Sequence, residues 1–474
     1  MQFLIIKKEI LISLRNTRIQ IAGIFLITLM LIAILVGRQG QQLIQAERAK
    51  AQTEMHHKWV NQGLKHPHSA AHFGHFAFKP KTVLSFLDVG LDNYTGISVF
   101  LEAHKQNEIL FSAAQDSNAM TRFGEMTAAL VLQFLFPLLI IFLTFNIFSR
   151  EREEGTLKLI YAQGVSIRQF LMGKVGGTYA MVLAIFIPII CIAYFALDYS
   201  SSNIDTNVNS KFIGLTIGYA LYFLVFIFIA ILVSAFAKNS SSSLLTSLGI
   251  WIIACIVLPK ATANLADKVY PTPSQYEFSK IIKEKVTNGI DGHNPKDERL
   301  NALKKRLLAE YAVSSIDELP VNWGGIAMQA GEEYTDKVYD QEFTKVENIF
   351  KKQNRLSEWA SFINPYLAIR HLSMAFAGTD FHHHTAFARG AENYRRAFVK
   401  KMNKDMELNH KPEMAFSDYK VGSEMWDSIE PFNYQLPNVI TTLSNQWRNV
   451  AALLLWLIGL IFSASIFSKN ISKL

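Results

Sequence analysis

Six long apolar segments constrain the fold of this chain more than any other feature. Each approaches the roughly 20 residues that a helix needs to cross the hydrocarbon core of a bilayer. Because backbone polar groups in lipid must be satisfied within the segment, we expect each one to be a helix. The expected spans are residues 19–37, 126–148, 175–197, 212–236, 241–258 and 450–467. The chain is therefore predicted to be an all-α polytopic membrane protein with six transmembrane helices.

Charges in the short connections predict the orientation of these helices. Basic residues are abundant in residues 1–18 and 149–174 and recur near residues 238 and 469–473, whereas the connection 198–211 has two Asp and only one Lys. Cytoplasmic connections carry the excess of Lys and Arg. We therefore expect a multi-pass membrane protein with both termini in the cytoplasm.

The two longest connections then lie on the extracytoplasmic side. They are residues 38–125 and 259–449, and together they hold more than half of the chain. Apolar residues recur at helical spacing in 296–311 and 332–355, and strand-like alternation is scarce, so this domain is predicted to be mostly helical.

Residues 1–18 form a further candidate helix. Phe3, Ile6, Ile10 and Leu14 follow helical spacing among basic residues. Such a helix could lie in the cytoplasmic membrane interface. The alternative is a basic flank that simply precedes the first span.

Composition agrees with a membrane protein and argues against a nucleic-acid partner. Hydrophobic residues make up 50% of the chain and charged residues 18%, below the roughly 25% usual in soluble domains. The net charge of +8 is not gathered into a basic run interleaved with aromatic residues, so the lipid bilayer is the expected partner. Cys191 and Cys255 both lie in apolar segments, and we expect no disulfide.

The segment 150–174, between the second and third spans, is unusual for a membrane loop. Five consecutive charged residues, 150–154, end the second span abruptly. Gly155 permits a turn, and Thr156 can cap a new helix. Leu157, Ile160 and Tyr161 then form an apolar stripe. This order predicts a short helix across the cytoplasmic mouth.

A second turn closes the segment. Gly164 and Val165 precede Ser166, which is expected to cap a helix that continues into the third span. A push on the short helix would then tilt two spans together, as a transporter driven by a separate motor requires. The alternative is a charged loop without a partner.

The 150–174 segment resembles the Glu-rich, Gly-Thr-Leu coupling region of ABC-2 type (type V) ABC transporter permeases. Six spans with cytoplasmic termini are also similar to that family, and the long connection after the fifth span resembles a bacterial subgroup with a large extracytoplasmic insertion. The resemblance implies two permease copies, or this chain with a similar permease, on two ATPase subunits. It also implies coupling through Glu151, Glu153, Glu154, Gly155, Thr156, Leu157 and Tyr161.

The chain is not expected to hydrolyse ATP itself. A P-loop needs Gly-x-x-x-x-Gly-Lys followed by Ser or Thr. Gly173-Lys174-Val175 lacks the hydroxyl residue and the earlier glycine. ATP and Mg are therefore expected in a partner subunit, and no cofactor is expected on this chain.

All thirteen histidines fall in the two long connections, and imidazole suits zinc, copper and nickel. His68 and His72 would share a face if their segment were helical, although Pro67 and Gly74 favour a loop there. The candidate metal ligands are His66, His68, His72, His75, His382, His383 and His384. The alternative is that histidines simply collect where lipid does not exclude them.

Two other functions remain open alongside transport. One is a mechanotransmission or scaffold complex, in which the ATPase drives the extracytoplasmic domain against an outside partner protein. The other is a metal-handling or metal-site maturation permease. It depends on the histidines and, for copper, on Met374, Met402, Met406, Met414 and Met425.

Overall fold

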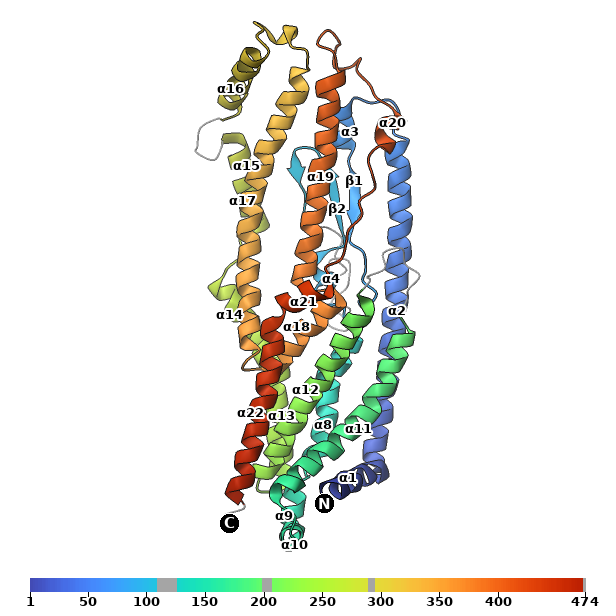
Figure 1. The fold of residues 1–474 in the computed structure, drawn as a ribbon, viewed down its shortest axis with the longest axis vertical. Helices are drawn as coiled ribbons and strands as arrows, with labels where there is room; N and C mark the ends of the chain where they lie inside the picture. Colours follow the sequence, from blue (N-terminus) through green and yellow to red (C-terminus); the bar gives the residue numbers. More distant parts are fainter. Residues whose placement is uncertain (109–125, 198–206, 289–294, 472–474) are drawn as a thin grey trace.

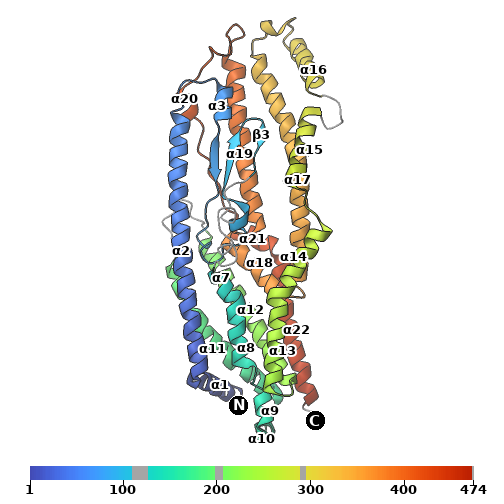
Figure 2. The ribbon, with the colours of Figure 1, turned by 180° about the vertical axis from the view of Figure 1, so that it is seen from behind.

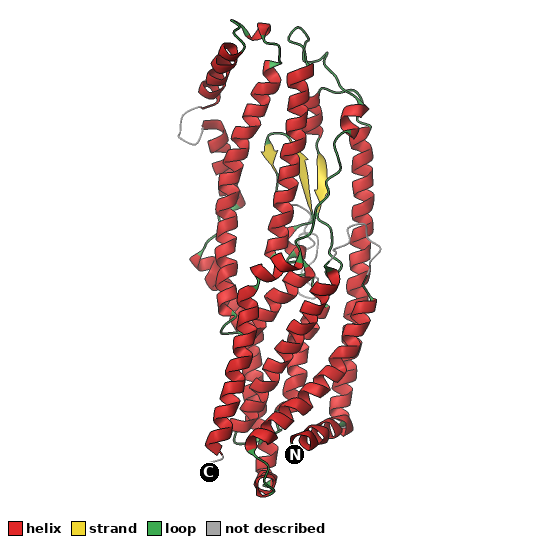
Figure 3. Ribbon diagram, in the orientation of Figure 1, coloured by secondary structure: helices red, strands yellow, loops and turns green. Residues whose placement is uncertain are grey.

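The computed structural model describes residues 1–108, 126–197, 207–288 and 295–471. These residues are mostly helical, and the strands that they contain form one small antiparallel sheet (Figure 3). The sheet has the order β1 (His75–Phe78), β2 (Ser98–Glu102) and β3 (Lys105–Gln106). The predicted all-α polytopic class is confirmed.

Six helical stretches among the described residues are long and apolar enough to cross a membrane. They are α2 (Thr17–Val60); α7 (Ala128–Leu130) with η1 (Val131–Leu135), α8 (Phe136–Thr144) and α9 (Ser149–Glu153); α11 (Ile167–Phe195); α12 (Val208–Phe236); α13 (Ser240–Ile252) with η2 (Ile253–Val257) and α14 (Leu258–Val269); and α22 (Trp447–Ile471). Figure 1 shows them side by side in the lower half of the molecule, with both termini at the same end. We call this half the membrane bundle.

Helix α12 forms the centre of the membrane bundle. Its aromatic side chains Tyr222 and Phe223 are completely buried, and Phe223 stacks on Phe136 of α8. Side chains from neighbouring elements satisfy carbonyl groups at the two π-helical turns. Tyr222 donates to the carbonyl of Gln133, and Asn364 donates to that of Ala254. Such bonds are needed because a π turn disturbs the regular backbone hydrogen bonds of the helix, and an apolar interior offers the freed carbonyls no other partner.

The N-terminal helix α1 (Gln2–Arg15) lies against a groove of glycines on α11. A Cβ atom added at Gly173 would lie 2.8 Å from Ile5, and one added at Gly177 would lie 2.5 Å from Glu9. The absence of side chains on this face therefore lets the two helices approach closely. Asn16 separates α1 from α2, and its side chain caps α2 by accepting from the amide of Arg18.

The distal domain comprises the described parts of residues 61–107 and 270–438. Its long helices are α17 (Trp323–Ala360) and α19 (Phe381–Asn409), which run side by side (Figures 1 and 2). Around them lie α3 (Pro67–Phe73), α4 (Asp92–Thr95), α15 (Gln275–Asn288), α16 (Pro295–Glu310), η3 (Ile316–Glu318) and α20 (Ser423–Asp427). Helix α18 (Pro365–Ala377) falls within this range of residues but packs on α12 and α22 and joins the core of the membrane bundle. The short helix α21 (Val439–Asn445) leads back into α22.

Helix α2 connects the two halves without interruption. It runs for 44 residues from the end with the termini to the distal domain (Figure 2). At its far end the Trp59 indole is buried and donates to the carbonyl of Trp426 (3.0 Å). The far end of α2 is therefore fixed to the distal domain.

Candidate functional site

Helix α9 holds the ends of two neighbouring helices through opposite charges. Arg152 donates to the carbonyls of Ala235 (2.5 Å) and Ala237 at the end of α12. The Glu153 carboxylate accepts from the Ser240 amide (2.9 Å) and hydroxyl (2.7 Å) at the start of α13. A cation thus meets the unpaired carbonyls of one helix, and an anion meets the unpaired amides of the next.

Glu151 connects α9 to α1 and α11. Its carboxylate lies 3.6 Å from the Lys174 ammonium and 3.8 Å from that of Lys8. Lys174 also binds Glu9 at 2.5 Å, and both of these side chains are buried. The segment is therefore joined to α1, α11, α12 and α13 by charged groups. Glu9, Arg152 and Lys174 were not among the residues predicted to couple to the ATPase. Two of them had a signal in the sequence, because Arg152 and Lys174 are basic residues next to a membrane span.

The predicted cap at Thr156 is wrong. Gly155 occupies the N-cap position of α10 (Thr156–Ala162), with φ of 73°, a conformation that glycine adopts readily. Thr156 instead donates its hydroxyl back to the Glu151 carboxylate. The predicted cap at Ser166 is confirmed, because Ser166 and Gln169 form a reciprocal capping box with two 3.2 Å hydrogen bonds.

Helix α10 has an inner and an outer face. Leu157, Ile160 and Tyr161 are half-buried against the membrane bundle. The outer face consists of the exposed residues Lys158, Leu159, Ala162 and Gln163, and Leu159 is 63% exposed. Figure 1 shows α10 projecting beyond both termini.

Two of the three predicted glutamates, Glu151 and Glu153, bind neighbouring helices. The third, Glu154, is exposed and accepts a hydrogen bond from Nε of Arg150 at 2.7 Å.

A cavity of about 760 Å³ opens beside this segment. Its lining combines Arg152 and Lys238 with apolar side chains of α12 and α22, among them Phe236, Ile466 and Phe467. Its lining residues come from α9, from the end of α12 and from the C-terminal part of α22.

The candidate histidines do not form one cluster. His66 stacks on Phe416 with 3.7 Å between ring centroids and accepts from the amide of His68. His75 packs on Trp59 and bonds Tyr394 at 3.0 Å. Burial lowers the pKa of His75 to about 4, so this ring is neutral at pH 7. The contacts of His66 and His75 are therefore ordinary packing and hydrogen bonding inside the domain.

The three consecutive histidines at the start of α19 point in different directions. His383 is buried and bonds the Asp380 carboxylate at 2.6 Å. Burial opposes ionisation of Asp380, but the hydrogen bond from His383 still lowers its pKa to about 2. Burial also lowers the pKa of His384 to about 4. Of the five methionines considered, Met374, Met402 and Met406 are buried core residues.

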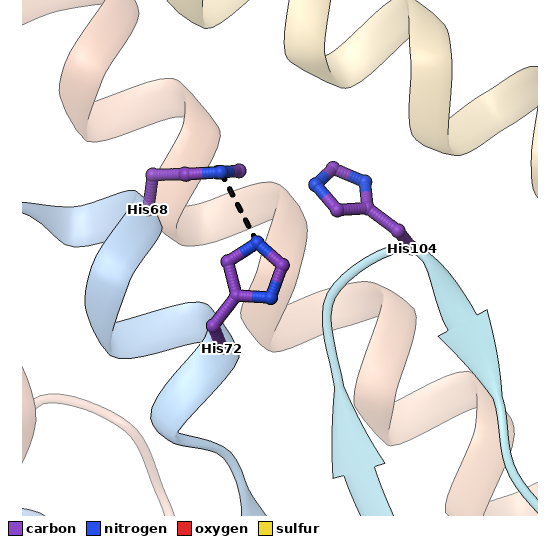
Figure 4. Close-up of side chains that lie close together, drawn as sticks. All are labelled: His68, His72 and His104. Carbon is purple, nitrogen blue, oxygen red and sulfur yellow. Dashed lines mark hydrogen bonds between the residues drawn. The ribbon is translucent and has the colours of Figure 1, made fainter.

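Two of the candidates, His68 and His72, do come together, and His104 joins them (Figure 4). The expected loop at residues 67–74 is wrong, because Pro67 occupies the first turn of α3, where its missing N–H costs nothing. The His68 and His72 Nε2 atoms are 3.2 Å apart. His104 comes from the turn between β2 and β3, and no local sequence signal placed it there.

Comparison with known families agrees with the arrangement of the bundle. Residues 94–260 match the ABC-2 family transporter protein, and residues 276–435 match a domain of unknown function, DUF3526. The first match covers the second to fifth spans and α9–α10, and the second covers most of the distal domain. No curated protein matches the chain. The match places an ABC-2 family transporter domain at residues 94–260, and together with the six apolar helices among the described residues it supports an ABC-2 type permease that crosses the membrane several times.

Proposed function

We propose that this chain is the membrane subunit of an ATP-driven ABC transporter of a bacterial inner membrane. Both termini and α9–α10 would face the cytoplasm, and the distal domain would be the extracytoplasmic insertion. Two permease copies, or this chain with a similar permease, would bind two separate ATPase subunits that carry ATP and Mg. The residues 150–174 would transmit the movement of those subunits.

The observation that carries this proposal is the contrast between the two faces of residues 150–163. One face is joined to four helices through Glu151, Arg152 and Glu153. The other face, on α10, is exposed and includes Leu159. A partner that pressed on the outer face would displace α1, α11, α12 and α13 together, because Glu151, Arg152 and Glu153 join α9 to all four helices.

Replacing Leu159 by Asp should disconnect the ATPase subunit while leaving the permease folded. Leu159 is 63% exposed, so the change removes no buried contact, but a charge on an apolar contact face disfavours docking. We expect at least a tenfold loss of the P-loop ATPase subunit that copurifies with the wild-type chain. The measurement is pull-down of the tagged permease from detergent, with the size-exclusion profile as the folding check.

Leu408→Asp is the matched control. Leu408 is 58% exposed on α19 in the distal domain, so the same substitution is made at similar exposure far from α10. This variant should retain the ATPase subunit. Full retention by Leu159→Asp would contradict the assigned docking face, and a wild-type chain that copurifies with no P-loop ATPase would contradict the proposed function.

Single cysteines should report the proposed orientation. In a background with Cys191 and Cys255 replaced by Ala, Lys58→Cys and Lys305→Cys should react with a membrane-impermeant maleimide from outside intact inner-membrane spheroplasts. Lys158→Cys should react only after the membrane is opened. All three positions are exposed. The reverse pattern would overturn the topology.

A second candidate function is mechanotransmission, in which the ATPase moves the distal domain against an outside partner protein. The observation that favours it is α2, which runs unbroken from α1 to the Trp59–Trp426 contact. A continuous helix can transmit a movement from the membrane bundle to the distal domain even if no substrate crosses the membrane. ATP hydrolysis by reconstituted complex that is stimulated only by an outside protein would support this function, whereas stimulation by a transported solute would support the first.

A further inference from the structure

Three imidazoles in the distal domain meet at one point without another evident role. The ligand atoms of His68, His72 and His104 all lie within 4.8 Å of one another. Figure 4 shows His68 and His72 projecting from successive turns of α3, with the His104 ring facing them from the hairpin. His72 and His104 are exposed, and His68 is half-buried. The cluster is therefore open to a solute.

The spacing of the first two rings suits a metal ion. The His68 and His72 Nε2 atoms are 3.2 Å apart. Two ligands of a tetrahedral zinc ion, at the usual Zn–N length of 2.0–2.1 Å, lie about 3.3 to 3.4 Å apart. The buried Nδ1 atom of His68 has no hydrogen-bond partner within the described ranges, so this ring does not complete a hydrogen-bond network.

The third ring is held in the orientation that a metal ligand needs. Nδ1 of His104 lies 2.5 Å from a Glu332 carboxylate oxygen, and the His104 amide donates to the same oxygen at 2.8 Å. This pairing places the ring proton on Nδ1 and leaves the Nε2 lone pair free, as in carboxylate–histidine–metal arrangements. His104 has a φ of 64°, a conformation that few residues other than glycine adopt and that the surrounding contacts must maintain.

We propose that His68, His72 and His104 bind a divalent metal ion of the zinc class, with Glu332 as the positioning residue for His104. Three imidazoles without a thiolate suit Zn²⁺, Cu²⁺ or Ni²⁺ rather than Ca²⁺ or Mg²⁺. Three protein ligands leave a fourth position for water or another ligand. The ion would join α3 to the β2–β3 hairpin and, through Glu332, to α17. This site is independent of the proposed coupling function.

Metal binding is best tested on the full chain in detergent after treatment with a chelator. Equilibrium dialysis against Zn²⁺ should give one ion per chain, and Co²⁺ should give the visible absorption of a tetrahedral nitrogen site. His72→Ala and His104→Ala should each weaken binding at least a hundredfold. His72 is exposed, so its replacement tests the ligand without disturbing the core.

His57→Ala is the control, because His57 is an exposed histidine of α2 outside the cluster. It should bind Zn²⁺ as the wild type does. Glu332→Gln should weaken binding by about 10- to 100-fold, the effect usual for a partner of a ligating histidine. A wild-type chain that binds no stoichiometric ion, or a His72→Ala chain that binds as tightly as the wild type, would overturn the proposal.

Discussion

Replacing Arg395 by Leu should lower the unfolding temperature of the distal domain by about 10 °C. This shift corresponds to a loss of about 3–5 kcal/mol of stability, which is typical when one partner of a buried ion pair is removed. The Arg395 side chain is 1% exposed. It donates to Glu392 (2.8 Å), to Asp336 (2.5 Å) and to the carbonyl of Glu102 (3.2 Å), and it lies 3.4 Å from Glu332. Its loss leaves three carboxylates without their shared cation.

Arg389→Leu is the matched control for this experiment. Arg389 lies on the same helix α19, but its side chain is 63% exposed and pairs with Glu347. Exposed pairs contribute roughly 0–1 kcal/mol. Unfolding can be followed by scanning fluorimetry and by hydrogen exchange of α17 and α19, which separates the distal domain from the membrane bundle. Equal shifts in the two variants would show that the Arg395 network is not the main support of this region.

Arg395→Lys should rescue little of the loss. One ammonium group cannot reproduce the planar fork that reaches Glu392, Asp336 and the Glu102 carbonyl in different directions. A full rescue by lysine would indicate that charge alone, rather than hydrogen-bond geometry, holds α17, α19 and β2 together.

Gly177→Ile should detach α1 from α11 and thereby abolish the proposed coupling of ATP hydrolysis to the permease. A Cβ at this position would lie 2.5 Å from the Cβ of Glu9 and 3.2 Å from the carbonyl oxygen of Ile6. The backbone of α1 must then move away, which also separates Glu9 from Lys174. Overpacking of this kind costs about 1–3 kcal/mol, and the separated charges add to it.

Labelling of Ile6→Cys in the background without native cysteines provides the measurement. Ile6 is half-buried against Gly176, so maleimide should react slowly in the parent and at least tenfold faster in Gly177→Ile. Gly249→Ile on α13 is the control, because a Cβ there meets nothing within 4 Å. Unchanged labelling together with normal ATPase coupling would show that the glycine groove does not hold α1.

The sequence predicted the parts of this structure that depend on local chemistry. Long apolar runs indicate helices because lipid leaves the backbone no other partners, and the described part of the chain contains six of them. The cap at Ser166 was predictable because Ser and Gln at that spacing satisfy two amides within one turn. The cap predicted at Thr156 was wrong because its neighbour Gly155 adopts a positive φ and takes the N-cap position. The Thr156 hydroxyl then turns back toward Glu151.

The contacts between distant segments could not be predicted in this way. His104 reaches α3 only because β2 pairs with both β1 and β3 and because Glu332 holds the turn between them. Arg395 finds Asp336 at a separation of 59 residues. Charge and periodicity do not encode such pairings in a single sequence. They mark the histidines as polar but not as neighbours, and of the seven candidates His68 and His72 lie together, joined by His104.

The unbroken course of α2 sets a geometrical relation between its two ends. Its 44 residues correspond to about 66 Å at 1.5 Å per residue. As a lever arm of that length, the helix would convert a tilt of about 5° at α1 into a displacement of about 6 Å at Val60. The Trp59–Trp426 hydrogen bond lies at the point of greatest travel. Small angular changes at one end are thus magnified at the other, with no hinge required between them.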